Sequence, residues 1–259
     1  MIRLVQSVAA KRELLGILVV RTLKIRYKDS ALGFLWTMLG PVFLILVYWL
    51  FLRMMRFSLP LPVLVTGIFV WQYLSMCLGD APLAVIGNVN LVKRAAFPRV
   101  LLPLSMTLAY LVNFLLSLVV VTVVLVLERA HPGPLWLLPV AVFAQFVLCL
   151  GLACLISALN VSYRDVQHVT GVVTTAWFFL TPVLYDVVEL TRSSPLAGYM
   201  AFYFLNPMAG ILALYRAALL GRPLPDPCWL AESLIVAGAV GWFGVTVFQR
   251  LQVGFADEL

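Results

Sequence analysis

Charged residues are scarce in this chain of 259 residues, and their scarcity decides the class of protein. Asp, Glu, Lys and Arg make up 11% of the sequence, whereas hydrophobic residues make up 63% and the mean hydropathy is +1.05. Soluble domains are about 45–50% apolar and about 25% charged. A soluble core of this size has no room for such an excess of apolar residues, so the composition predicts an integral membrane protein.

Residues that bind metals or form disulfides are also few. The four cysteines form no C-x-x-C pair, and most of them lie in apolar segments, where a free cysteine behaves as a small hydrophobic residue. The two histidines, His131 and His168, lie in loops predicted on opposite membrane faces, so they cannot share a metal. The sequence therefore predicts neither a metal site nor a disulfide.

Motifs for catalysis and for energy coupling are missing as well. The sequence contains no G-x-x-x-x-G-K-[ST] phosphate loop, no H-E-x-x-H and no G-x-S-x-G. Asp165 lies near His168, but no serine or cysteine nucleophile lies beside this pair. A proton relay needs ionisable groups deep in the membrane, and the long apolar runs are nearly free of them. We expect no enzyme and an energy source outside this chain; a membrane-embedded lipid or sugar transferase is the alternative.

The net charge of +7 comes from clusters of lysine and arginine. Basic residues crowd the segment before the first long apolar run, and Lys93, Arg94 and Arg99 lie in one loop. This is the pattern of a cytoplasmic charge bias on a membrane protein and does not indicate nucleic-acid binding. A six-span arrangement with both termini in the cytoplasm places twice as many basic residues inside as outside.

Long apolar runs predict an all-α fold in which residues 1–259 form a single transmembrane domain. A helix rises about 1.5 Å per residue, so about 20 residues cross a hydrocarbon core of ~30 Å. In the last run, Gly238, Gly241 and Gly244 recur at three-residue spacing, which favours close packing of helices. Spans are predicted at residues 34–52, 61–78, 101–127, 135–159, 168–185 and 234–248.

Two shorter helices are predicted on the cytoplasmic side. Residues 1–30 have an apolar face and a basic face, typical of an amphipathic helix that lies along the membrane surface; a solvated arm is the alternative. Residues 91–97 form a helix that is too short to span the membrane, that Asn88 or Asn90 can cap and that Pro98 ends. It is either a docking element for a partner or an ordinary connector.

Residues 196–220, before the last predicted span, contain two short apolar runs that are broken at Asn206-Pro207. Runs of this length are typical of re-entrant or interfacial helices rather than of spans. A single span kinked at the proline is the alternative, and it would give seven spans.

The fifth predicted span carries hydroxyl and aromatic side chains at three- and four-residue steps, so they share one helix face. Rings stack on the apolar faces of sugars and hydroxyls exchange hydrogen bonds with them, so we predict that this face lines a path for a glycan. Ordinary packing, or a belt of interfacial aromatic residues, is the alternative. The predicted channel residues are Trp36, Phe43, Tyr48, Thr170, Thr174, Trp177, Phe178, Thr181 and Tyr185, and the re-entrant segment adds Tyr199, Tyr203 and Tyr215 as a gate.

Three segments together resemble the bacterial polysaccharide-export permeases, which are the ABC type 2 exporters of O-antigen, capsular polysaccharide and teichoic acid. The segments are RTLKIRYKDSALGFLWTMLGP, NLVKRAAFPRVLLPLS and NVSYRDVQHV. The resemblance covers nearly the whole chain in matching order.

The resemblance implies a homodimer with six spans per subunit, an interface helix at the N-terminus and two copies of a separate cytosolic ATPase subunit. The ATPase would bind ATP and Mg²⁺, and this chain would hold no cofactor. The substrate would be a lipid-linked polysaccharide, with O-antigen as the first choice, carried across the bacterial inner membrane; capsular polysaccharide, teichoic acid, a small lipid or a drug are alternative cargoes. The resemblance places a coupling helix at residues 88–98 and the interface helix at residues 8–28. The residues implied to meet the ATPase are Asn90, Lys93, Arg94, Phe97 and Pro98 of the coupling helix and Arg21, Lys24 and Arg26 of the interface helix.

Overall fold

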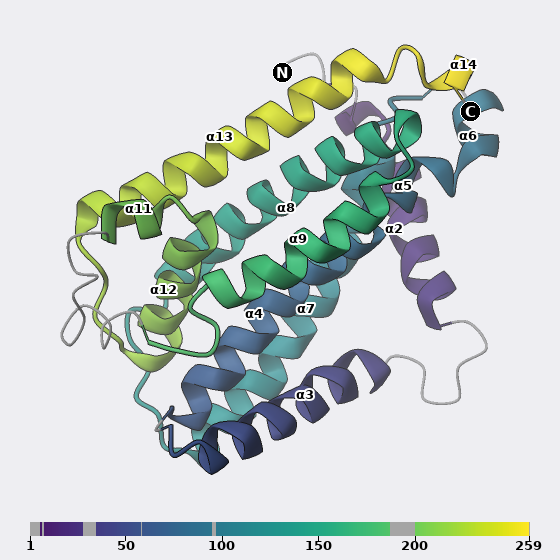
Figure 1. Cartoon of the computed structure of the whole chain (residues 1–259). Helices are drawn as coiled ribbons and strands as arrows, with labels where there is room; N and C mark the ends of the chain where they lie inside the picture. The colour runs from purple at the N-terminus through teal and green to yellow at the C-terminus, as the bar shows by residue number, and fades with distance from the viewer. Residues whose placement is uncertain are drawn as a thin grey trace.

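The computed structural model describes residues 6, 8–27, 35–57, 59–94, 97–186 and 200–258 (Figure 1). Within them, every regular element is a helix, so the prediction of an all-α fold is confirmed for this part of the chain. The helices are α2 (Arg12–Tyr27), α3 (Leu35–Met54), α4 (Leu61–Asp80), α5 (Leu83–Ile86), α6 (Val89–Arg94), α7 (Leu101–Leu127), α8 (Leu137–Ser162), α9 (Val166–Leu180), α11 (Met200–Phe204), α12 (Pro207–Leu220), α13 (Pro227–Leu251) and α14 (Phe255–Glu258).

Helix α8 is the centre of the bundle and contacts α4, α7, α9, α12 and α13. Its closest neighbour is α13, because glycines allow the two backbones to approach. A methyl group added to Gly151 of α8 or to Gly244 of α13 would overlap the backbone of the other helix. The predicted close packing is confirmed for Gly241 and Gly244, whereas Gly238 faces open space.

Two amides of α8 fix its position against α4 in the apolar core. Gln145 is fully buried and donates to the carbonyl of Val70 at 2.7 Å. Asn160 donates to the carbonyl of Pro82, just after α4, at 2.9 Å. Each bond pairs a buried side-chain N–H with a backbone carbonyl where the dielectric constant is low, so both favour this one alignment of α8 with α4.

Four helices within the described residues are long and apolar enough to cross a membrane: α4, α7, α8 and α13. Helix α3 has 20 residues, of which Met38–Met54 form the shorter apolar helix, and α9 has 15 residues. The prediction of a helical membrane protein is confirmed, and the count of six spans stays a prediction.

The last predicted span begins earlier in the structure than its apolar run indicates. Helix α13 begins at Pro227, whereas the span was predicted from Leu234. The Asp226 carboxylate accepts a hydrogen bond from the backbone N–H of Cys228 at 2.8 Å. Asp at the N-cap followed by Pro at N1 is a common start of a helix, so the capping residues, rather than the apolar residues, set this boundary.

The fifth predicted span ends earlier than expected. Helix α9 ends at Leu180, and Thr181 has an extended backbone with φ −99° and ψ 143°. Pro182 follows Thr181, and a residue before proline is disfavoured in the helical region because of a steric clash with the proline ring. Residues up to Tyr185 therefore form a turn rather than the last part of a span.

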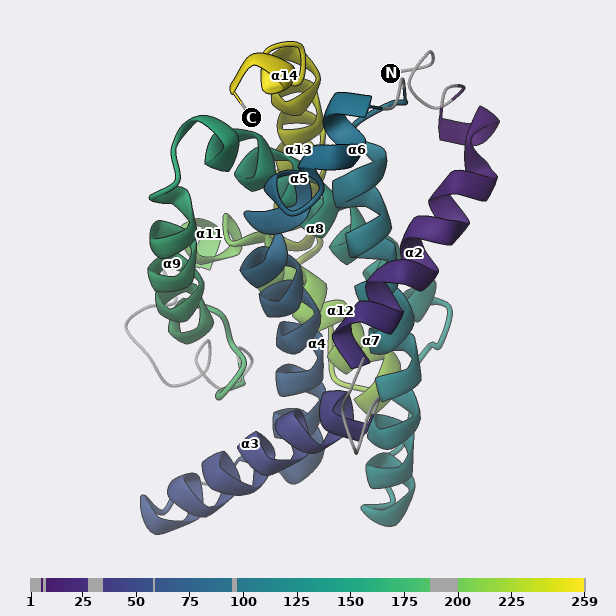
Figure 2. The same cartoon turned by 90° about the vertical axis from the view of Figure 1, so that its right-hand side faces the viewer.

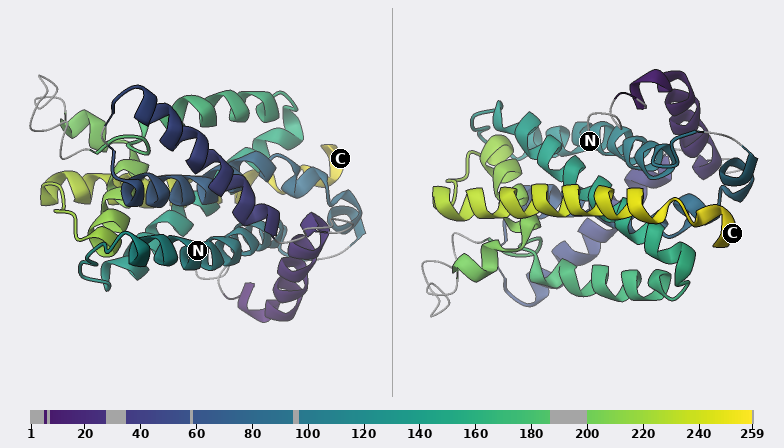
Figure 3. Two further views of the ribbon diagram at one scale, coloured as in Figure 1. Left: turned by 90° about the horizontal axis from the view of Figure 1, so that it is seen from below. Right: turned by 90° about the horizontal axis from the view of Figure 1, so that it is seen from above.

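The molecule has two distinct ends. Helices α2, α5, α6 and α14 gather at what we call the terminal end (Figures 1 and 2). The opposite end comprises α11, α12 and the loops at 128–136 and 221–226. Helices α2 and α9 lie on opposite flanks of the bundle, as the views along its vertical axis show (Figure 3).

Candidate functional site

The segment predicted to couple to an ATPase lies at the terminal end, where α5 and α6 connect α4 to α7. Asn90 and Lys93 are exposed, and Phe97 and Pro98 are half-buried. The side chain of Arg94 lies outside the described residues. The fold therefore presents part of this segment to solvent, as a docking element requires.

Asn88 joins this segment to α2. Its Oδ1 accepts a hydrogen bond from Nη1 of Arg21 at 3.1 Å, and its Nδ2 donates to the carbonyl of Ala84 at 3.0 Å. A single side chain thus contacts both the helix before it and α2. A displacement of the α5–α6 segment would therefore pull or push α2 through this hydrogen bond.

Helix α2 is amphipathic, as predicted from its pattern of residues. Leu18 is buried, Leu15 and Val19 are half-buried, and the helix packs against α7. On its other face, Arg21 and Lys24 are exposed. The side chain of Arg26 lies outside the described residues.

The C-terminal segment also packs at the terminal end, which its short polar sequence did not indicate. Phe255 of α14 is buried, with its ring centroid 5.4 Å from that of Phe248. The hydroxyl of Ser162 donates to Glu258 at 2.6 Å, and the guanidinium of Arg99 donates to the carbonyl of Gln252. The segment before α6 is therefore connected to α2 through Asn88, and the segment after α6 is connected to the end of α13 through Arg99.

The predicted channel face of α9 is turned towards the bundle within this subunit. Thr170 and Thr174 each donate a hydrogen bond of 2.7 Å to the carbonyl four residues earlier, and Thr181 is fully buried. Phe178 is buried between Tyr48 and Trp71, at centroid distances of 5.8 Å and 5.6 Å. The burial of this face differs from the exposure that a channel wall needs, and whether it contacts a glycan stays a prediction.

The other face of α9 is the exposed one. An open groove runs along it, lined by three polar side chains and by small or apolar residues: Gln167, His168, Gly171, Val172, Thr175, Ala176 and Phe179. A methyl group added to Gly171 would meet nothing within 4 Å. This face therefore combines free space, hydrogen-bonding groups and an aromatic ring.

The predicted channel residues of α3 divide by exposure. Trp36 and Phe43 are 59% and 69% exposed, so each presents a ring to the surroundings of this subunit. Tyr48 is half-buried against Phe178 of α9. Helix α3 contacts α4 and α7 but leaves most of its apolar surface uncovered.

Asn206 connects three elements at the opposite end. Its Oδ1 accepts hydrogen bonds from Nε1 of Trp177 at 2.8 Å and from the backbone N–H of Met208 at 3.1 Å. Its Nδ2 donates to the hydroxyl of Thr181 at 3.0 Å. Asn206 is thus the N-cap of α12, and it also anchors the end of α9.

Arg216 of α12 is 4% exposed and holds the turn that follows α9. Its guanidinium donates to the carbonyl of Tyr185 at 3.0 Å and to the carbonyl of Val183 at 3.2 Å. Burial lowers the pKa of Arg216 to about 10, and the Asp186 carboxylate opposes this shift, so the side chain keeps its charge at neutral pH. The turn is therefore fixed to α12 by a charged donor.

The predicted gate tyrosines lie in different environments. The hydroxyls of Tyr203 and Tyr185 lie 3.0 Å apart and are joined by a hydrogen bond. Tyr215 is fully buried, with its ring 5.7 Å from that of Phe114, so it packs in the core of this subunit. Tyr199 lies outside the described residues.

Sequence reasoning missed the roles of Asn206 and Arg216. Arg216 interrupts an apolar run in the sequence. An ionisable residue in such a run is a signal that its charge has a buried partner. For Asn206, the signal was the following Pro207, because Asn at the N-cap and Pro at N1 mark the start of a helix.

The titratable side chains of the described residues do not gather into a metal site. No group of three or more His, Cys, Asp or Glu side chains in this part of the chain is placed to hold a metal ion. His168 lies in α9 and lines the exposed groove, and His131 lies in the loop between α7 and α8. The arrangement suits the guidance of a ligand along a helix.

Comparison with known proteins agrees with this arrangement. The family described as ABC-2 type transporter matches residues 13–220. The chain is 37% identical over 270 aligned residues to the O-antigen export system permease protein RfbA of Myxococcus xanthus, with 100% of both chains covered. It is 27% identical over 254 residues to a permease of the same name from Klebsiella pneumoniae, with 95% of each chain covered. The chain belongs to the ABC-2 type transporter family.

Proposed function

We propose that this chain is the channel-forming permease subunit of an ATP-driven exporter that carries lipid-linked O-antigen polysaccharide across the bacterial inner membrane. The observation that carries the proposal is the similarity, over the whole chain, to permeases named for O-antigen export in two bacteria. The chain acts as one transmembrane domain without a cofactor of its own, and a partner ATPase binds ATP and Mg²⁺.

Six spans are proposed: α3 and α9 in addition to α4, α7, α8 and α13. The 20 residues of α3 extend about 30 Å, the thickness of a hydrocarbon core. Helix α9 lies beside α8 and α4, which are long enough to span. The pair α11 and α12, broken at Asn206, forms the re-entrant gate, in which Tyr185 and Tyr203 are hydrogen-bonded.

A homodimer is proposed to enclose the channel between α3 and α9 of the two subunits. Its support is the exposed apolar surface on both helices, including Leu46 of α3 and Val172 and Phe179 of α9. The wall is the exposed groove of α9, extended by Trp36 and Phe43. On the other side of α9, Trp177 and Thr181 hold the end of this helix through their hydrogen bonds with Asn206.

Two copies of the ATPase are proposed to dock at the terminal end. Exposed basic residues gather there, including Lys24, Lys93, Arg164 and Arg250, which supports a cytoplasmic location for both termini. ATP-driven movement of the partner would displace α6, and Asn88 and Arg21 would pass the movement to α2.

The channel wall is tested with a bulky side chain in the open groove. In a host that lacks its own copy of the gene, the unaltered chain should restore O-antigen at the cell surface. Gly171→Trp should abolish the O-antigen ladder seen by gel electrophoresis while the variant still purifies with the ATPase, because the glycine faces open space. Gly238→Trp is the matched control, since Gly238 of α13 also faces open space but lies away from α9.

Two results would contradict the proposal at different points. If the unaltered chain does not restore O-antigen, the cargo is wrong. If Gly171→Trp exports as well as Gly238→Trp, the exposed face of α9 is not the wall of the channel.

A further inference from the structure

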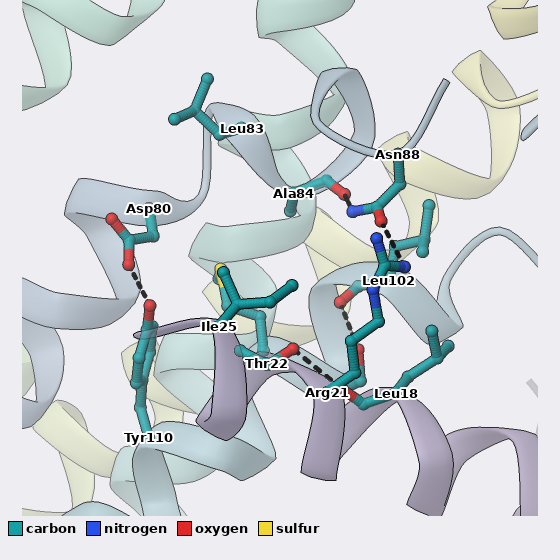
Figure 4. A pocket seen from close by; sticks show the side chains of 12 residues that line it. Leu18, Arg21, Thr22, Ile25, Asp80, Leu83, Ala84, Asn88, Leu102 and Tyr110 are labelled. Atoms are coloured by element: carbon teal, nitrogen blue, oxygen red, sulfur yellow. Dashed lines mark hydrogen bonds between the residues drawn. The ribbon is translucent and has the colours of Figure 1, made fainter. Parts of the chain in front are cut away.

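A small hollow lies between the middle parts of α4 and α7. Its volume is about 20 Å³, and about 10–15 Å³ is enough for one water molecule. Tyr110 lines this hollow and also a larger cavity beneath α2, where its hydroxyl donates to Asp80 (Figure 4). The hollow is therefore a smaller space further along α7 from the terminal end, and its other lining residues include Gln72, Tyr73 and Met76 of α4 and Asn113, Phe114 and Ser117 of α7.

Asn113 is the side chain that indicates a ligand in this hollow. It is 4% exposed, and neither its Nδ2 nor its Oδ1 has a hydrogen-bond partner among the described residues. Burial of an amide without a partner is costly, so native structures pair the large majority of such groups with protein or with ordered water. Asn113 therefore needs a hydrogen-bonding group that the described part of the chain does not supply.

Two further side chains of the hollow can share such a ligand. Gln72 lines it from α4 and carries a second amide, with two donors and an acceptor. The Ser117 hydroxyl donates to the carbonyl of Phe114 at 2.6 Å, which leaves its oxygen able to accept a hydrogen bond. Because Asn113 bonds directly to neither of them, a small molecule in the space between them can bond to all three.

The depth of the hollow excludes the polar groups of lipids as the ligand. Asn113 lies near the middle of the 27 residues of α7, about 18 Å from the nearer end of the helix. Half of a hydrocarbon core is about 15 Å thick, so phosphate and glycerol groups lie too far away. Acyl chains offer no hydrogen bonds. The partner of Asn113 is therefore a molecule that is small enough to enter the hollow itself.

We propose that this hollow holds one ordered water molecule, which bonds to Asn113, Gln72 and Ser117 and joins α4 to α7 in the middle of the membrane. A buried water makes about three hydrogen bonds, the number that these side chains offer. A bridging water is enthalpically nearly as good as a direct hydrogen bond. Helices α4 and α7 flank the α5–α6 segment, so the water stabilises the alignment of the two helices that carry this segment.

Radiolytic footprinting of the purified full-length protein in lipid nanodiscs tests for the water. X-rays convert water to hydroxyl radicals, which oxidise a methionine sulfur in contact with that water. Met76 lines the hollow, whereas Met208 is 1% exposed and lies in the apolar core. We expect mass spectrometry of peptides to find oxidation of Met76 and not of Met208. An unoxidised Met76 in the unaltered protein would overturn the proposal without any variant.

Isotope exchange distinguishes an ordered water from bulk water that reaches Met76. The protein is mixed with ¹⁸O-labelled water immediately before the X-ray pulse. Met55, in the turn after α3, is 62% exposed and serves as the reference for bulk water. The fraction of ¹⁸O in oxidised Met76 should lag behind that in Met55, because an ordered water exchanges slowly. Equal fractions would show that bulk water fills this region and would overturn the proposal.

Variants assign the water to Asn113. Asn113→Leu fills the hollow with an apolar side chain and should abolish the oxidation of Met76. It should also lower the unfolding temperature by about 2–4 °C, because Gln72 and Ser117 lose their shared partner. An unfolding temperature that rises would show that Asn113 has no partner at all and would overturn the proposal.

Two other variants keep the test decisive if Asn113→Leu does not fold. Gln72→Leu removes a half-buried partner of the water and should bring the ¹⁸O fraction of Met76 closer to that of Met55. Thr122→Val is the matched control on α7, because its exposed hydroxyl donates within the helix to the carbonyl of Leu118 at 2.8 Å. It should leave Met76 unchanged. Equal effects of Gln72→Leu and Thr122→Val on Met76 would refute the proposed bridge.

Discussion

The two ends of the bundle are held together by different kinds of contact. At the opposite end, the half-buried Asn206 and the buried Arg216 and Ser233 each bond to groups of another element. At the terminal end, α2 and α14 are joined to their neighbours by apolar contacts of the buried Leu18 and Phe255, and the side-chain hydrogen bonds there, Arg21 to Asn88 and Ser162 to Glu258, are exposed.

The difference matters because exposed and buried hydrogen bonds have different energetic consequences. A typical hydrogen bond contributes about 0.5–1.5 kcal/mol net, whereas a buried group left without its partner costs about 1–3 kcal/mol. The opposite end should therefore be rigid, and the terminal end should move at low cost. A transporter that responds to a partner at one end and keeps a defined gate at the other needs this division.

The largest loss of stability is expected from Arg216→Met at the opposite end. The change leaves the carbonyls of Val183 and Tyr185 without their buried donor, so the free energy of unfolding should fall by about 3 kcal/mol. Thermal unfolding of the purified protein in mild detergent measures the loss. Arg216→Lys keeps a charge on a smaller donor and should lose less; equal stability of Arg216→Met and the unaltered protein would show that the network is not what holds this end.

The interface between α8 and α13, which we call the seam, runs from one end of the molecule to the other. Its rigidity decides whether the two ends can move independently. Gly244→Ala places a methyl group against the backbone at Gly151, so we expect a loss of about 2 kcal/mol from overpacking. Gly238→Ala is the matched control in the same helix. It faces open space, so it should be neutral or stabilise the helix by about 0.5–1 kcal/mol. Equal unfolding temperatures for the two variants would mean that the seam is loose.

Much of the fold could be predicted from the sequence because apolar runs and helix length depend on local chemistry. The positions of α4, α7 and α8 follow directly from the runs of apolar residues. The start of α13 was predicted too late, since apolarity was used and the Asp226-Pro227 cap was not. Helix boundaries at caps are local signals as well, so this error was avoidable.

The orientation of α9 could not be predicted in the same way. Its sequence shows two faces, one with threonines and rings and one with valines and Gly171. In water, the more apolar face of a helix packs inwards. A membrane removes that rule because lipid is as apolar as a protein core. Here packing turns Thr170 and Phe178 inwards and leaves Val172 exposed, so only the three-dimensional structure assigns the faces.

A loss of stability smaller than that of Arg216→Met is expected from Asn206→Ala. The variant loses the cap of α12 and the contacts with Trp177 and Thr181, and we expect a fall of about 2 kcal/mol in the free energy of unfolding. Asn206→Ser separates the two roles, because serine is also a good N-cap but is too short to reach both partners. Full recovery of stability in Asn206→Ser would mean that the cap accounts for the loss and that the link to α9 contributes nothing.

The smallest effect on stability is expected from Ser162→Ala at the terminal end. The bond from Ser162 to Glu258 is exposed, so its loss should change the free energy of unfolding by no more than about 0.5 kcal/mol. Hydrogen exchange of the α14 amides should nevertheless become faster, because α14 has fewer contacts to hold it, while exchange in α12 should not change. If Ser162→Ala lost as much stability as Asn206→Ala, the two ends would be equally rigid. The terminal end could then not move at low cost, as a coupling end requires.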